Sequence, residues 1–85
     1  MTREQVAELP KRWEMGEVVR TSRGPMNVLR LISEDLDWDV EDDGRDIRVE
    51  YYEVWWCGNK AVAETSVGGD GKTWLNEYPV DILIN

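Results

Sequence analysis

The residues best suited to chemistry lie in one acidic stretch, DVEDDGRDIRVE, which runs from Asp39 to Glu50. Its carboxylates alternate around a glycine, which is the arrangement that Ca²⁺ needs in an EF-hand loop. In that interpretation the ligands are Asp39, Glu41, Asp43 and Glu50. A strand rather than a helix is expected after the loop, and the sequence holds one such loop instead of a pair. We therefore expect a charged hairpin connection that keeps a sheet edge soluble, with weak binding of a divalent cation as an alternative.

The same region also offers a dense negative charge. Residues 34–53 hold ten acidic and two basic side chains, and the whole chain carries a net charge of −8. Contacts with phosphate need Lys and Arg, so direct binding to nucleic acid is not expected. Closely spaced carboxylates suit a basic partner, because electrostatic attraction steers the two together. An acidic inhibitor or nucleic-acid mimic, of phage or anti-defence type, is therefore an alternative function.

The chain lacks the residues on which many enzymes depend. It has no His, which excludes Ser-His and Cys-His catalysis and His-ligated metal sites. A single cysteine, Cys57, offers no intramolecular disulfide and no multi-Cys zinc site, and we expect its thiol to be buried or half-buried. We expect a protein without enzymatic activity or a cofactor. The lone cysteine favours the reducing cytoplasm, and we expect neither a signal peptide nor a membrane span.

The aromatic residues favour binding instead. Trp55 and Trp56 are adjacent on a predicted strand, so they point to opposite faces and one is expected to lie outside, although the sequence does not decide which. An outward Trp beside a Tyr is a typical hot spot for a protein partner. The predicted contact surface combines aromatic residues with the acidic loop. It consists of Trp38, Tyr52, Trp55, Trp56, Asp37, Asp39, Glu41, Asp42 and Asp43.

A β-sheet must position these residues. The clearest strand runs from Ile47 to Cys57, with a mainly apolar face at odd positions and a face that begins polar at Arg48 and Glu50. Further strands are expected near residues 16–21, 26–32, 33–40, 61–67 and 73–78, with turns between them. Thr2 can cap a short helix over residues 2–9 that ends at Pro10, and a frayed terminus is the alternative. This pattern predicts one all-β domain, a sandwich or barrel, across residues 1–85.

Three stretches resemble the YodC-like family of small uncharacterised bacterial proteins: GEVVRTSRGPMNV, YYEVWWCGNK and NEYPVDILI. The matching positions are Gly16, Val18, Val19, Gly24, Pro25, Met26, Val28, Trp55, Trp56, Gly58, Tyr78 and Leu83. The resemblance covers roughly residues 16–32 and 47–84, and Glu53 and Cys57 depart from the family pattern. It implies a small SH3-like barrel of about five strands over residues 16–85, with residues 1–12 as an extension and an acidic insertion at 33–46. It implies no established activity, so we expect a protein-binding module, either monomeric or a homodimer.

Overall fold

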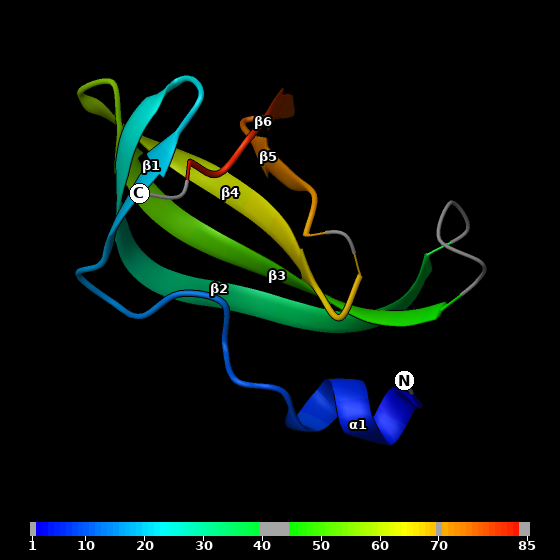
Figure 1. The fold of residues 1–85 in the computed structure, drawn as a ribbon. Helices are drawn as coiled ribbons and strands as arrows, with labels where there is room; N and C mark the ends of the chain where they lie inside the picture. The colour runs from blue at the N-terminus through cyan, green and yellow to red at the C-terminus, as the bar shows by residue number, and fades with distance from the viewer. Residues whose placement is uncertain (1, 40–44, 70, 84–85) are drawn as a thin grey trace.

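The protein is one curled antiparallel β-sheet with a short helix beside it (Figure 1). The computed structural model describes residues 2–39, 45–69 and 71–83. Their elements are α1 (Arg3–Glu8), β1 (Val18–Thr21), β2 (Gly24–Asp39), β3 (Arg45–Trp56), β4 (Asn59–Val67), β5 (Thr73–Leu75) and β6 (Tyr78–Val80). Each strand pairs with the next in the chain, and the sheet curls into a half-barrel. The prediction of an all-β domain is confirmed. In these ranges no helix is long and apolar enough to cross a membrane.

The predicted acidic insertion is the outer part of a long hairpin. β2 and β3 pair from Met26 opposite Trp56 to Asp39 opposite Arg45. Two register shifts in β2, around Leu29 and Ile32, interrupt this ladder near its middle. Such bulges bend a strand and increase its twist, which helps the sheet to curl around its core. The residues at the tip of the hairpin, 40–44, lie outside the described part of the chain.

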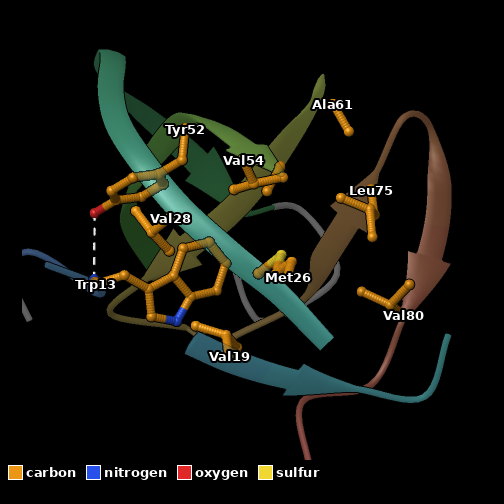
Figure 2. Packing of buried hydrophobic residues seen from close by; sticks show 10 residues of the cluster. Trp13, Val19, Met26, Val28, Tyr52, Val54, Ala61, Leu75 and Val80 are labelled. Carbon is orange, nitrogen blue, oxygen red and sulfur yellow. Dashed lines mark hydrogen bonds between the residues drawn. The ribbon is translucent and has the colours of Figure 1, made fainter. Parts of the chain in front are cut away.

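The concave face of the sheet holds the hydrophobic core (Figure 2). Its buried side chains are Trp13, Val19, Met26, Val28, Tyr52, Val54, Ala61, Ala63, Leu75 and Val80. Trp13, which precedes β1, enters this core, and its ring centroid lies 5.0 Å from that of Tyr52. Its backbone N–H donates a hydrogen bond of 3.3 Å to the Tyr52 hydroxyl, so the segment before the sheet is fixed to the middle strand.

The inner face of β3 begins with polar residues, which the sequence analysis expected to face solvent. Arg48, Glu50, Tyr52 and Val54, at even positions, are all buried. Tyr52 is 1% exposed, so the prediction that it contributes to an outer contact surface is wrong. Tyr52 is instead packed against Trp13, and its hydroxyl donates a 2.7 Å hydrogen bond to Glu50.

The N-terminal segment explains why polar side chains face inward. Arg48 donates hydrogen bonds to the carbonyl oxygens of Val6, Ala7 and Pro10 at 2.8, 3.3 and 2.7 Å, and it bonds to Glu50 through Nε at 3.1 Å. Glu50 also accepts from the backbone N–H of Arg12 at 2.9 Å. A buried ion pair is tolerated when its remaining hydrogen-bonding capacity is satisfied in this way. The polar start of β3 is therefore the attachment site of residues 6–12.

The helix forms as predicted. The side chain of Thr2 accepts from the backbone N–H of Gln5, and the Gln5 side chain accepts from the backbone N–H of Thr2. This capping box satisfies two donors that a helix start otherwise leaves open. Val6 is fully buried, so α1 is docked rather than frayed.

Cys57 lies in the tight turn between β3 and β4, one residue beyond the end of the strand. Cys57 and Gly58 have φ angles of 52° and 76°, which are typical of a two-residue hairpin turn. The Cys57 thiol is exposed, so the prediction of a buried or half-buried thiol is wrong. The turn predicted at residues 58–60 is present but begins one residue earlier.

The two ends of the sheet meet along a short seam. Thr21 of β1 forms a single antiparallel bridge with Ile82, which follows β6. Ser22 N–H donates to the Asp81 carbonyl at 2.8 Å, and Asp81 N–H donates to the Ser22 hydroxyl at 2.8 Å. Leu83 N–H reaches the Arg20 carbonyl at 2.8 Å. Up to Leu83, where the described part of the chain ends, these bonds draw the curled sheet together without a continuous ladder.

Candidate functional site

The structure divides the residues that the sequence placed on one contact surface. Trp55 is 48% exposed on the outer face of β3, whereas Trp56 is half-buried and its Nε1 donates to the Arg23 carbonyl at 3.1 Å. This decides which of the two tryptophans faces outward. Asp37 pairs with Ile47 at the other end of the hairpin. Eight residues along β3 separate Ile47 from Trp55, which is roughly 26 Å of extended strand.

Several predicted residues cannot be placed by their side chains. Glu41, Asp42 and Asp43 lie outside the described residues, and Trp38 and Asp39 are described only as backbone at the end of β2. Among the described residues, Trp55 is therefore the member of the predicted aromatic set with a largely exposed side chain.

The outer face of the sheet also gathers aromatic residues outside the predicted contact set. Tyr51, Glu64 and Trp74 lie side by side on β3, β4 and β5, because Tyr51 pairs with Glu64 and Glu64 with Trp74. Val62 lies two residues from Glu64 on the same face and is 45% exposed. We call Tyr51, Trp55, Val62 and Trp74 the outer aromatic surface. In β5 Trp74 points outward between the buried Thr73 and Leu75, and the residue types Thr-Trp-Leu carry no alternation that could have indicated this.

A shallow hollow of about 660 Å³ opens in this face. It is lined by Tyr51, Val62, Glu64, Trp74, Asn76 and Glu77. Two rings and two carboxylates therefore surround one space that is accessible from solvent.

The turn between β5 and β6 closes one side of the hollow. Asn76 and Glu77 have φ angles of 48° and 71°, so the predicted extended stretch at 73–78 is interrupted by a two-residue turn and gives two strands. The sheet has six strands because the two stretches expected at 26–32 and 33–40 form the single strand β2, whereas the stretch expected at 73–78 gives β5 and the start of β6. The Asn76 side chain accepts from Val62 N–H at 2.9 Å, and Asn76 N–H donates to the Val62 carbonyl at 2.9 Å. The turn is thus fixed to β4.

The charges on the outer face are arranged in two groups. Glu53 lies between Arg30, at 3.5 Å, and Lys60, at 3.9 Å, so its charge is balanced. In the described ranges neither Glu64 nor Glu77 forms an ion pair. The hollow is therefore the more negative part of the outer face.

The carboxylates around the hollow also affect the pKa of the Tyr51 phenol. Partial burial raises its pKa above the ordinary value, and Glu64 raises it further through its charge and a hydrogen bond. Asp35 and Asp37 on β2 contribute in the same direction. Carboxylates at the start of the hairpin extension and in the hollow therefore act on the same phenol.

Glu50, one of the four predicted calcium ligands, is not available to a metal ion. Glu50 is fully buried; its Oε1 accepts from the Arg12 backbone N–H and the Tyr52 hydroxyl, and its Oε2 accepts from Arg48. Glu41 and Asp43 lie outside the described residues, as does the side chain of Asp39. Within the described ranges no three acidic or Cys side chains are grouped closely enough to hold a metal ion.

Chemically, the outer aromatic surface is suited to binding, since its rigid rings lie beside the carboxylates of the hollow on a fixed sheet. Trp and Tyr supply contact area at little cost in conformational entropy, and carboxylates orient a partner that carries donors or positive charge. Comparison with known proteins assigns no family to this arrangement. No family model matches the chain, and no curated protein or solved structure matches it either.

Proposed function

We propose that this protein is a non-enzymatic binding module that contacts a protein partner through its outer aromatic surface. The observation that carries the proposal is the exposure of Trp55 and Trp74, at 48% and 38%, on one face of a small sheet. The opposite face already holds the core, so these rings are not needed there. Large aromatic side chains left on the surface are typical of interaction sites.

The size of the rings supports a specific contact. Trp55 and Trp74 keep 48% and 38% of their surface exposed and Tyr51 is half-buried, so the rings supply only a part of the roughly 800 Å² that one side of a standard interface buries. The sheet positions them before the partner arrives, which limits the entropy lost on binding. The charge pairs of Glu53 with Arg30 and Lys60 lie between the rings, and they add orientation to the apolar contact.

A second candidate function is that of an acidic inhibitor or nucleic-acid mimic. It is favoured by the shape of the hairpin, whose acidic end extends away from the curled part of the sheet (Figure 1). Glu34, Asp35 and Asp37 lie on this extension in β2. Strong weakening of partner binding between low and moderate salt would favour this function over the aromatic one.

For the fold we propose the finer description of an SH3-like barrel. It is supported by the curled antiparallel sheet and by the bridge that joins Thr21 to Ile82 across its ends. The resemblance to the YodC-like family, the cytoplasmic location and the homodimer stay predictions.

Affinity capture with matched variants tests the proposed function. Immobilised wild type, Trp55→Ala, Trp74→Ala and a control, Met15→Ala, are incubated with lysate of the source organism and the retained proteins are identified by mass spectrometry. Met15 is also an exposed apolar residue, but it lies in the turn before β1. We expect a defined partner that wild type and Met15→Ala retain and that both Trp variants lose. Circular dichroism confirms that each variant is folded, and a partner retained equally by all four proteins overturns the proposal.

A further inference from the structure

We propose that the hollow between Tyr51 and Trp74 receives an arginine side chain from a basic segment of the partner. This inference rests on the proposed function, because it names the chemistry that the outer aromatic surface recognises. The hollow offers both features that a guanidinium prefers, which are aromatic faces to stack on and carboxylates to accept its hydrogen bonds.

The strand register creates the space for one planar group. Tyr51 and Trp74 lie on β3 and β5, on either side of Glu64 on β4. Neighbouring strands are about 4.8 Å apart, so the two aromatic residues start roughly 10 Å from each other at the backbone. That separation leaves room for a flat group beside the rings, near the Glu64 carboxylate, which is hydrogen-bonded to the Tyr51 hydroxyl.

The charge of the hollow selects a cation over an apolar group. Glu64 and Glu77 both line it, and in the described ranges neither has an ion-pair partner. Asp35 and Asp37 add to the field at Tyr51. A guanidinium presents several donors in one plane, so it can bond to a carboxylate while it stacks on a ring.

The molecule's own arginines on nearby elements are engaged elsewhere. Arg30 pairs with Glu53, and Arg23 lies 5.2 Å from the ring centroid of Tyr78. Arg12 and Arg48 donate to the buried network around Glu50 and Thr65. None of these four arginines lines the hollow, so they leave it open to a positive group from another molecule.

The backbone of Glu77 gives a separate indication. Its φ of 71° lies in the left-handed region, where a two-residue hairpin turn strongly prefers Gly. A carboxylate held at this strained position lines the hollow. Strain of this kind is commonly retained where the side chain has a role in binding.

The probe for this inference is Nα-acetyl-arginine amide, compared with its neutral isostere, the citrulline derivative. Each is titrated into ¹⁵N-labelled protein while the backbone amides and the Trp side-chain N–H signals are followed by NMR. We expect shifts at Tyr51, Glu64 and the Trp74 indole with the arginine probe, and binding of citrulline weaker by at least about tenfold. The same titration of a Glu64→Gln/Glu77→Gln variant is expected to lose at least about tenfold in affinity. Glu17→Gln, an exposed Glu before β1, serves as the matched control and should bind as wild type does.

A third probe, Nα-acetyl-lysine amide, is titrated in the same way. Three results overturn the inference: equal binding of citrulline and arginine, shifts spread along the acidic hairpin instead of the hollow, or stronger binding of the lysine probe than of the arginine probe. The last result would indicate an ammonium site. Partner capture separates this inference from the proposed function. If the Trp variants lose the partner but Glu64→Gln/Glu77→Gln retains it fully, the surface binds without an arginine and only this inference fails.

Discussion

Glu77 is the residue at which the fold and the proposed site make opposite demands. A non-glycine residue with a φ of 71° is strained, and Gly removes that strain. We expect Glu77→Gly to stabilise the protein by about 1 kcal/mol, which for a domain of this size raises Tm by roughly 4–8 °C. Differential scanning calorimetry measures the change.

Glu77→Ala is the control for this effect, because it removes the same carboxylate but keeps a β-carbon in the left-handed conformation. It should leave Tm near that of the wild type. If Ala and Gly raise Tm equally, the gain comes from losing the charge, and the argument from backbone strain is wrong.

Tyr52 makes stability sensitive to alkaline pH. Burial and the hydrogen bond to Glu50 raise its pKa above the ordinary value of 10.0. The folded protein therefore keeps the Tyr52 proton at pH values at which the unfolded chain has lost it. The contribution of Tyr52 to the free energy of unfolding is complete below about pH 10 and is lost as the pH rises further. We expect the free energy of unfolding to fall more steeply above pH 10 in wild type than in Tyr52→Phe, by at most about 1.4 kcal/mol for each pH unit.

Urea denaturation at pH 8 and at several values above 10 tests this. Tyr52→Phe should already be less stable at pH 8 by about 1–2 kcal/mol, because the hydrogen bond to Glu50 is lost. Tyr51, whose pKa is also raised, is present in both proteins and does not affect the comparison. Parallel pH dependences in the two proteins would contradict the assignment to Tyr52.

At the scale of the elements, the attachment of the N-terminal segment to β3 depends on Arg48. Its replacement by Ala leaves the Glu50 carboxylate buried without its cation and removes the donors to Val6, Ala7 and Pro10. We expect Arg48→Ala to destabilise the protein by about 3–5 kcal/mol, measured by chemical denaturation.

Arg30→Ala provides the matched comparison, since Arg30 also pairs with a Glu of β3. Arg30 is exposed, and its bond to Glu53 lies on the outer face. We expect a loss of only about 0–1 kcal/mol there. Similar losses in the two variants would mean that the buried network around Glu50 does not fix the N-terminal segment.

The same network marks the limit of what the sequence could predict. The alternation in residues 47–56 identified β3, and Thr2 and Pro10 bounded a short helix, because both signals are local. The choice of inner face was not local. Arg48 and Glu50 indicate solvent by residue type, and only their contacts with residues 6–12 show why they are buried.

The sequence indicated which residue types would form a candidate site, but not where on the sheet they would meet. Aromatic residues and carboxylates were expected to form a contact surface. Either Trp55 or Trp56 was expected to face outward, and Trp55 is the exposed one. The hollow depends on Tyr51, Glu64 and Trp74 meeting across three strands, which requires the register of β3, β4 and β5. It also depends on a turn at Asn76 and Glu77, and Glu is a residue that gives no turn signal.

At the scale of the whole molecule, stability should be unevenly distributed along the sheet. β3 lies in the middle of the strand order, and Val54 pairs with Val28 on one side and Ala61 on the other. The seam that joins β1 to the residues after β6 has one isolated bridge and a few hydrogen bonds, including those from Ser22 N–H and Leu83 N–H. Such a seam can open while the core stays folded.

Native-state hydrogen exchange followed by NMR tests this distribution. We expect the Val54 amide to exchange only through global unfolding, whereas the amides of Ser22 and Leu83 should be at least about 100-fold less protected. Arg23, stacked on Tyr78 at 5.2 Å, spans the same seam, so Arg23→Ala should lower protection at Ser22 and Leu83 and leave Val54 nearly unchanged. Equal protection at all three amides would mean that the seam opens only when the sheet unfolds as a whole. The curled sheet would then behave as a closed barrel in its energetics, although its ladder is interrupted between β1 and β6.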